Sequence, residues 1–229
     1  MHYSGIYKDD FGSVIISLEN DFRNLSVEID GVNFKGSEFT DLVLLEQEKY
    51  TSEQIARFTF LSTLMYGTNI IQETLCNCYF KIIVPQNLIE HSTNLTFSTD
   101  LTIECFIGNT RPKPQGGLDF EQIKVSLTIN GKLFEGAGDV IEIALDVIHK
   151  QFEGQYNFKN CYGCMYGDYS IYGQSSFGTM RCYVNQKENY LKVKDKSEYE
   201  GLTSDFEMVQ EIYSCHHYES RKKGIGYRG

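Results

Sequence analysis

The sequence predicts an α+β protein that is mostly β, with an antiparallel, sandwich-like N-terminal part, one clear helix and a β-rich C-terminal segment that carries a four-cysteine knuckle. Three observations support this fold class. Short runs rich in β-branched and aromatic residues, separated by turn residues, fill residues 1–136. One run with helical periodicity covers residues 139–152. Four of the seven Cys residues lie between positions 161 and 215.

The first strands are expected to form hairpins. Residues 12–19, 25–29 and 32–35 are short and β-branched, and Asp30-Gly31 between the last two is a strong two-residue turn signal. Residues 41–46 fit either a strand or a helical turn, because periodicity cannot decide over so short a run. Residues 52–58 look briefly helical, and we expect irregular or strand structure after Arg57.

The middle of the chain predicts further strands. Residues 78–84 form a strand that Pro85 is expected to stop, because proline cannot donate to a ladder. Asn130-Gly131 predicts a tight hairpin between residues 123–129 and 132–134. Residues 95–98 and 101–108 alternate, and one side of the second run carries Leu101, Ile103, Cys105 and Ile107.

Residues 139–152 are the best helix. Asp139 is expected to cap the first amides and Glu142 to complete a capping box, and Gly154 stands where the helix should stop. Its apolar stripe consists of Ile141, Ala144, Leu145, Ile148 and Phe152. Strands are expected at residues 155–159, 179–184, 190–193 and 207–215. We therefore expect a β-rich body over residues 1–136 and a helix plus four-cysteine segment over residues 137–229, packed together as one unit.

The C-terminal cysteines have the spacing of a metal knuckle. Cys161 and Cys164 form a C-x-x-C pair, 17 residues separate Cys164 from Cys182, and 32 separate Cys182 from Cys215. A C-x-x-C turn offers two thiolates from adjacent backbone, and two later thiolates can complete a zinc tetrahedron. Because protein ligands would fill every position, the zinc would be structural. Four thiols that merely pack in the interior are the alternative, and a redox pair or an iron site fits the pattern less well.

Three cysteines lie outside this segment. Cys76 and Cys78 are two residues apart on an expected strand, so both point to one face, and Cys105 lies on an expected strand nearby. A second thiol site would need more ligands than these, so packing in the core is the favoured interpretation.

Several ordered motifs follow residue 118. They are C-Y-G-C at 161–164, D-Y-S-I-Y-G at 168–173, F-G-T-M-R-C at 177–182 and V-Q-E-I-Y-S-C at 209–215. With these motifs the chain resembles an uncharacterised bacterial family, a domain of unknown function, and residues 56–59 and 75–79 resemble it more loosely. The resemblance implies that the four cysteines act as a unit, and it implies no activity. His216 and His217 depart from the family pattern and are poor candidates for shared ligands.

The charge balance limits the function. The net charge is −10 and the pI is about 5.0, so the chain as a whole repels nucleic-acid phosphates and anionic membranes, and it favours a basic protein partner. No apolar run is long enough to span a membrane, and the first residues lack the basic and apolar regions of a signal peptide. We therefore expect a cytoplasmic protein with reduced thiols.

A tyrosine- and glycine-rich loop at residues 166–178 offers a candidate contact surface. Tyrosine provides a large amphipathic area at low entropic cost, although the same rings could instead cover the metal site. The residues considered for partner binding are Tyr166, Asp168, Tyr169, Tyr172 and Phe177. The basic stretch 221–228 could contact a partner, but a solvated terminus is favoured.

These observations favour a non-enzymatic interaction protein with a structural zinc site, for example an immunity protein that neutralises a basic bacterial toxin. The alternative is an enzyme or ligand-binding protein with a pocket beside the tyrosine loop, in which Asp168, Tyr169 or Tyr172 would supply polar groups. A deep cleft lined by these side chains would favour the alternative, whereas a flat exposed tyrosine patch would favour the interaction protein. The sequence contains no recognisable catalytic motif.

Overall fold

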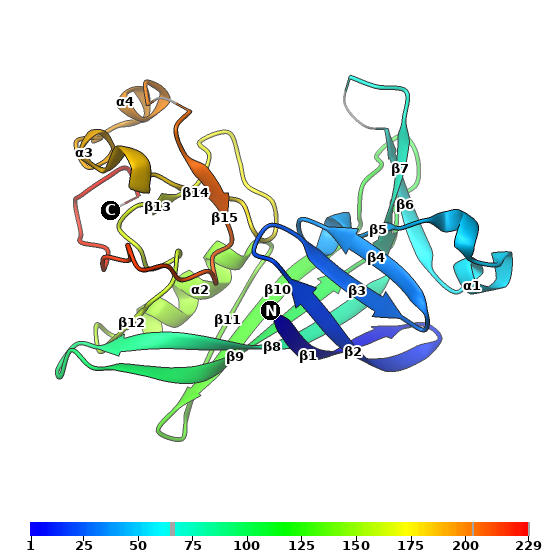
Figure 1. Cartoon of the computed structure of the whole chain (residues 1–229), viewed down its shortest axis with the longest axis horizontal. Helices are drawn as coiled ribbons and strands as arrows, with labels where there is room; N and C mark the ends of the chain where they lie inside the picture. Colours follow the sequence, from blue (N-terminus) through cyan, green and yellow to red (C-terminus); the bar gives the residue numbers. More distant parts are fainter. Residues whose placement is uncertain (65–66, 203, 229) are drawn as a thin grey trace. The chain divides into compact units, whose positions relative to one another are not determined.

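The computed structural model describes residues 1–64, 67–202 and 204–228 and is mostly β (Figure 1). Its strands form one large antiparallel sheet and a second, three-stranded sheet, and there are few helices. In the large sheet the strand order is β11-β10-β9-β8-β1-β2-β3-β4-β5-β7-β6, with β12 also paired to β8. The predicted fold class is confirmed at this level. No helix in the described ranges is long and apolar enough to cross a membrane.

The chain forms two compact units, each made of two segments. Unit 1 comprises residues 1–84 and 102–125, and unit 2 comprises residues 85–101 and 126–229. This division differs from a cut after residue 136, because three strands contribute to both units: β8 (Cys78–Glu90), β9 (Thr96–Ile107) and β10 (Glu121–Ile129).

Unit 1 contains most of the hairpins. Its remaining elements are β1 (His2–Asp9), β2 (Gly12–Asn20), β3 (Leu25–Ile29), β4 (Val32–Gly36), η1 (Phe39–Asp41), β5 (Val43–Leu44), η2 (Gln47–Lys49), α1 (Ser52–Ala56), β6 (Thr59–Leu64) and β7 (Ile71–Cys76). The Asp30-Gly31 hairpin is confirmed, with both residues at positive φ. Residues 41–46 form the end of η1 and the short β5. The strand expected after Arg57 is β6, although Met65 and Tyr66 lie outside the described residues.

The core of unit 1 is built from aromatic rings on the inward face of the sheet. Tyr7 of β1 contacts Phe80 of β8 at 5.2 Å between ring centroids, and Phe34 of β4 contacts Phe58, just before β6, at 4.9 Å. Tyr7 also meets Phe58 at 6.4 Å. Phe58 therefore joins strands that lie far apart in the sheet order to one hydrophobic core. The alternating burial of β1 to β4 agrees with this, because one face of these strands points into the core.

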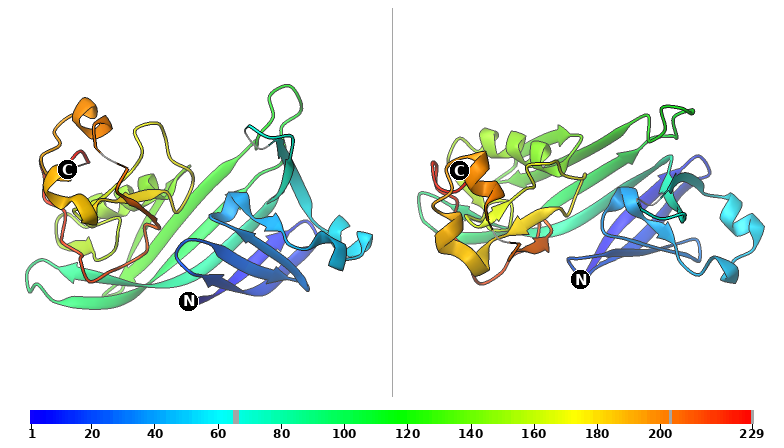
Figure 2. Two further views of the ribbon diagram at one scale, coloured as in Figure 1. Left: turned by 45° about the horizontal axis from the view of Figure 1, so that its top comes forward. Right: turned by 90° about the horizontal axis from the view of Figure 1, so that it is seen from above.

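Unit 2 is built around a helix and a loop-rich C-terminal region. Its own elements are β11 (Lys132–Gly138), α2 (Ile141–Gln151), β12 (Tyr156–Phe158), β13 (Gly167–Asp168), β14 (Met180–Cys182), η3 (Val184–Gln186), α3 (Lys187–Tyr190), α4 (Lys196–Glu200) and β15 (Glu207–Val209). Helix α2 packs on β11, and its predicted apolar stripe is buried (Figure 2). Strands β13, β14 and β15 make the three-stranded sheet. The Asn130-Gly131 hairpin before β11 is confirmed by positive φ at both residues.

Four sequence predictions about local structure are wrong. Strand β8 does not stop at Pro85 but continues to Glu90. The alternating runs 95–98 and 101–108 are confirmed as strand, and the single strand β9 covers most of both. Among the described pairs on one side of β8, Ile82 is the last partner of β1 and Leu88 the first partner of β12. Pro85 lies between these paired stretches, so its missing N–H removes no ladder bond on this side.

The other three wrong predictions concern unit 2. Asp139 does not cap α2, because Val140 is the N-cap residue and the amide of Ile141 donates instead to the carbonyl of Ser176 at 2.8 Å. Residues 190–193 are not a strand. Tyr190 ends helix α3, where its ring stacks on Tyr183 at 4.8 Å, so tertiary packing overrides the β propensity of the segment. The strand expected over residues 207–215 is short and ends at Val209.

Candidate functional site

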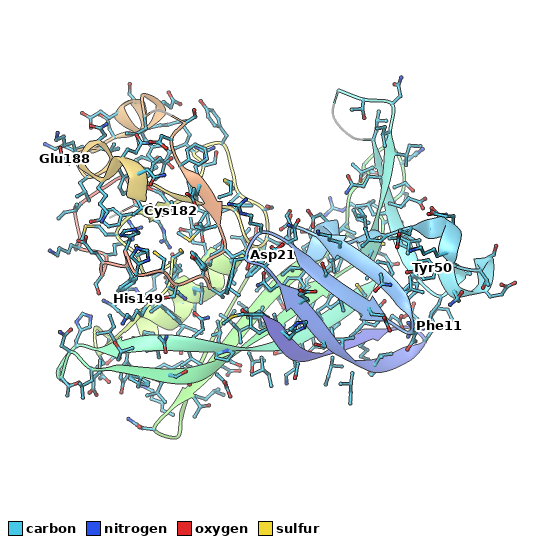
Figure 3. All side chains as sticks on the ribbon, in the orientation of Figure 1. Phe11, Asp21, Tyr50, His149, Cys182 and Glu188 are labelled. Carbon is cyan, nitrogen blue, oxygen red and sulfur yellow. The ribbon has the colours of Figure 1, made fainter. Side chains whose placement is uncertain are left out.

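The four C-terminal cysteines come from three segments of unit 2. Cys161 and Cys164 lie on the turn after β12, where the amide of Cys164 donates to the carbonyl of Cys161 at 3.2 Å. The amide of Cys161 donates to the carbonyl of Tyr213 at 2.7 Å, which holds the turn against the segment that contains Cys215. Cys182 ends β14 (Figure 3) and pairs with Gly167 of β13. Backbone hydrogen bonds therefore bring the segments that carry these cysteines close together.

The thiols influence one another electrostatically. Burial raises the pKa of Cys161, and the neighbouring thiols of Cys182, Cys164 and Cys215 raise that pKa further. Burial also raises the pKa of Cys182, with Cys164 and Cys215 again contributing. All four are free thiols, and only Cys215 is more than slightly exposed. Without a cation, burial and the neighbouring thiols therefore favour the protonated form of Cys161 and Cys182.

The thiols are near one another without being arranged as ligands. Within the described ranges, His, Cys, Asp and Glu side chains form no group of three or more that could hold a metal ion. A change of χ1 rotamer can turn a thiol towards a metal ion without moving the backbone. Zinc binding therefore requires only that the segments carrying these cysteines lie close together. Zinc binding stays a prediction.

The tyrosine-rich loop is mostly interior. Of the five residues considered for partner binding, Tyr166, Asp168, Tyr169 and Phe177 are buried, whereas Tyr172 is 81% exposed. Four of these side chains therefore build the inside of unit 2, and only Tyr172 is available to a partner. It lines a small cavity of about 150 Å³, and its hydroxyl donates to Glu200 at 3.3 Å.

The buried members of the loop form a hydrogen-bonded network. Asp168 accepts from the hydroxyl of Tyr190 and from the amide of Tyr169, both at 2.7 Å. Burial raises the pKa of Asp168, and these two hydrogen bonds offset part of that rise. The hydroxyl of Tyr199 donates to the carbonyl of Tyr169 at 2.8 Å and accepts from Tyr183 at 2.7 Å. This network explains why the segment needs so many tyrosines: each ring fills the core while its hydroxyl pairs a buried polar group.

Glu211 was not singled out by the sequence. It is fully buried, and burial raises its pKa from 4.5 to about 7. Its carboxyl accepts from the amide of Gly178 at 2.8 Å and from the hydroxyl of Tyr169 at 3.2 Å. The only signal in the sequence is its position within the motif V-Q-E-I-Y-S-C, next to the buried Ile212.

Two arginines of the basic C-terminal stretch are docked against unit 2, whereas Lys222 and Lys223 are exposed. Arg228 pairs with Glu142 of α2 at 2.8 Å, lies 4.6 Å from the ring centroid of Tyr162, and has a side chain that is only 14% exposed. Arg221 donates from Nη2 to the carbonyl oxygens of Cys164, at 2.8 Å, and Gly167. The expectation of a solvated terminus is therefore wrong for both arginines.

The other three cysteines pack inside unit 1. Cys76, Cys78 and Cys105 are all buried. Burial raises the pKa of Cys76 to about 11, and it raises the pKa values of Cys78 and Cys105 as well. These thiols are therefore neutral near pH 7.

Each unit contains a cavity large enough for a small ligand. The unit 1 groove has a volume of about 560 Å³ and is lined by residues that include Lys8, Asp9, Asp10, Tyr79, Glu104 and Phe106. The unit 2 pocket has a volume of about 520 Å³, and its lining includes Glu142, Asp146, His149, Arg221, Lys223 and Arg228. The linings described for these two cavities do not include Asp168, Tyr169 or Tyr172.

Comparison with protein families gives one match. Residues 1–167 match the family described as "Family of unknown function (DUF6304)". The resemblance to an uncharacterised family is confirmed, although the matched region is the N-terminal part of the chain. It includes Cys161 and Cys164 and ends before Cys182 and Cys215. The search of curated proteins and the search of solved structures each found no match.

Proposed function

The chain belongs to the DUF6304 family of unknown function, and we propose that it is a non-enzymatic cytoplasmic protein that binds a basic protein partner through the unit 1 groove. The observation that carries this proposal is the chemistry of the groove lining. Three carboxylates, Asp9, Asp10 and Glu104, face one lysine, Lys8, beside aromatic rings.

Two of these carboxylates have neutral hydrogen-bond donors as partners. Asp10 accepts from the side-chain amide of Asn77 at 2.7 Å, and Glu104 accepts from the hydroxyl of Tyr79. Both donors are neutral, so they orient the carboxylates without cancelling the negative charge. Asp9 differs, because Arg57 lies 3.6 Å away and compensates it.

Unit 1 as a whole supports an attraction for basic partners. It contains 15 Asp and Glu residues and 9 Lys and Arg residues, a formal charge of −6 within the total of −10. Long-range attraction of this kind speeds the encounter with an oppositely charged protein.

Aromatic and aliphatic side chains beside the carboxylates provide contact area. The rings of Tyr79 and Phe106 lie 4.8 Å apart, and the ammonium of Lys124 already lies 4.9 Å from the centroid of Phe106. An arginine of a partner can use such rings in the same way. Next to Lys8 on the same face of β1, Ile6 pairs with Ile15, which is 87% exposed. Protein interfaces combine apolar contact area with a polar rim, and this part of unit 1 offers both.

A labelled octa-arginine peptide is a suitable first probe. We expect Asp10→Asn/Glu104→Gln to weaken its binding about 10-fold, equivalent to about 1.4 kcal/mol. The matched control is Glu48→Gln/Glu53→Gln, which removes the same charge from exposed positions of unit 1. Equal weakening by both double variants would mean that net charge alone attracts the peptide, and it would refute the groove as the binding site.

The narrowest form of this proposal is a toxin-immunity protein. A basic toxin would then be the partner, and the groove would cover its basic surface. The test is protection of cells against a candidate toxin, which the groove variant should lose and the control variant should keep. Full protection by the groove variant would exclude this form.

We also propose that zinc, bound by Cys161, Cys164, Cys182 and Cys215, stabilises unit 2. The support is the convergence of four thiols whose mutual repulsion a divalent cation would relieve. A site of this kind supplies roughly 10 to 16 kcal/mol of apparent binding free energy at neutral pH. Chelation should therefore unfold much of residues 155–229.

Elemental analysis tests the zinc proposal directly. The purified protein should contain about one zinc per chain. Cys182→Ser should lose most of it, whereas Cys105→Ser, in unit 1, should retain it. Protein that remains free of zinc after reconstitution with zinc salts would overturn the proposal.

A further inference from the structure

The unit 2 pocket has no part in the proposed binding of a basic partner. Its volume of about 520 Å³ lies within the range of about 300–1,000 Å³ typical of small-molecule sites. Helix α2 supplies Glu142, Asp146 and His149 to the lining, and the C-terminal stretch supplies Arg221, Lys223 and Arg228. All lining residues belong to unit 2.

The carboxylate of Glu142 is already engaged. Its Oε1 accepts from Nε of Arg228 at 2.8 Å, and its Oε2 accepts from the side-chain amide of Gln174 at 2.9 Å. The guanidinium cancels the charge of Glu142, and both oxygens are occupied. A bound molecule would therefore find little unpaired negative charge at this position.

Asp146 is engaged in a similar way. Its Oδ1 accepts from the hydroxyl of Tyr162 at 2.6 Å and lies 3.8 Å from Nη2 of Arg228. Burial and the charge of Asp146 raise the pKa of Tyr162, so the hydroxyl remains a donor. Arg228 thus holds both acidic side chains of the lining.

Two cations of the lining, Arg221 and Lys223, form no salt bridge in the described part of the chain. Arg221 donates from Nη2 to main-chain carbonyl oxygens, which are neutral acceptors. In the described part of the chain, Lys223 has no ion-pair partner and its side chain is exposed. Arg221 acts on the buried Asp168, whose pKa it lowers, so part of its charge is offset, whereas the charge of Lys223 is fully available to a ligand.

His149, labelled in Figure 3, adds an imidazole to the same pocket lining. Its Nε2 is 3.0 Å from the side-chain oxygen of Asn157. The rings of Phe152 and Tyr162 pack edge-on against it, each at 6.4 Å between centroids. The side chain is thus held in one orientation, which favours directional contact with a ligand.

We propose that the unit 2 pocket binds a small organic anion through Arg221 and Lys223, with His149 orienting it. The shared chemistry is a carboxylate or a phosphate ester, because both present oxygens that guanidinium and ammonium groups recognise. The aromatic wall formed by Phe158 and Tyr162 accommodates the apolar part of the molecule.

The test is a titration of the full-length protein followed by NMR chemical-shift changes. The probes are citrate and glucose 6-phosphate, with glucose as the neutral control. We expect saturable binding of at least one anion at millimolar concentration, with shifts at the pocket residues, and none with glucose. The two anions distinguish a carboxylate from a phosphate specificity.

Lys223→Gln should weaken binding about 10-fold, as expected for loss of a charge-assisted hydrogen bond. Lys222→Gln is the matched control, because the neighbouring lysine is exposed and does not line the pocket. Asp10→Asn/Glu104→Gln should leave anion binding unchanged, so failure of this proposal is distinguishable from failure of the proposed function. Absence of saturable binding by either anion, or equal weakening by both lysine variants, would overturn the proposal.

Discussion

Replacing Glu211 with Gln should change how the stability of unit 2 depends on pH. Burial raises the pKa of Glu211 in the folded protein to about 7, whereas the unfolded chain should keep the usual 4.5. Below about pH 4.5 both states are protonated. Between these two pKa values the folded state retains its proton and the unfolded state loses it, so stability falls as pH rises towards about 7.

The size of this effect follows from the shift. A difference of about 2.5 pKa units corresponds to about 3 kcal/mol of unfolding free energy, fully lost above about pH 7. Gln cannot ionise, so the variant should avoid this loss. It can also keep both contacts, because its carbonyl can accept from the amide of Gly178 while the hydroxyl of Tyr169 rotates to accept from its amide group.

Urea unfolding monitored by tyrosine fluorescence measures the effect between about pH 5 and pH 8. Other groups, including the thiols, also titrate, so the informative quantity is the difference in unfolding free energy between Glu211→Gln and wild type. This difference should shift in favour of the variant by about 2–3 kcal/mol as pH rises. Glu188→Gln, at an exposed position, is the control. A difference that does not change with pH would refute the reasoning.

Three further predictions concern packing and backbone conformation. Ile148→Ala should destabilise unit 2 by about 2–5 kcal/mol in urea unfolding, whereas Ile143→Ala, on the exposed side of the same helix, should cost less than about 1 kcal/mol. Similar costs for both would mean that α2 does not bury the described face. Tyr190→Phe should cost about 1–3 kcal/mol, because Asp168 loses a buried donor at 2.7 Å, and an unchanged urea midpoint would exclude this contact. Gly131→Ala should cost about 1 kcal/mol, since its φ is 80°, and a stabilised variant would contradict this turn geometry.

The elements that the sequence predicts well are those decided by local chemistry. Asp30-Gly31 and Asn130-Gly131 form the expected hairpins because few other residue pairs tolerate positive φ at both positions. The apolar stripe of α2 is equally local, since a spacing of three and four residues defines one face of a helix. The hydrophobic pattern was therefore sufficient to predict a mostly β chain with one main helix.

The sequence predictions fail where contacts between residues far apart in the chain determine the local structure. Pro85 continues a strand because of where the neighbouring strands pair, which the local sequence does not record. The amide of Ile141 is satisfied by Ser176, so the predicted cap at Asp139 is not needed. The burial of Glu211 could not be predicted for the same reason, because it depends on segments far away in the chain.

The candidate site was predicted in part. The spacing of the cysteines identified the segments that the structure brings together, since a C-x-x-C turn and later cysteines are recognisable locally. The exposure of the tyrosine loop could not be read from composition, because tyrosine serves equally well in a core and at an interface. The sequence does not indicate the unit 2 pocket, because its charged residues come from α2 and from residues 221–228, and no sequence motif connects these two segments.

Strands β8, β9 and β10 contribute residues to both units, which limits where the chain can be divided. Any continuous fragment that holds all of unit 1 must reach Val125, and it then carries residues 85–101 of unit 2 without the rest of that unit. Recombination at a single point therefore cannot transfer either unit to another gene without part of the other unit. Proteolysis at a single site between residues 85 and 125 would likewise damage both units, so the two are inherited and degraded together.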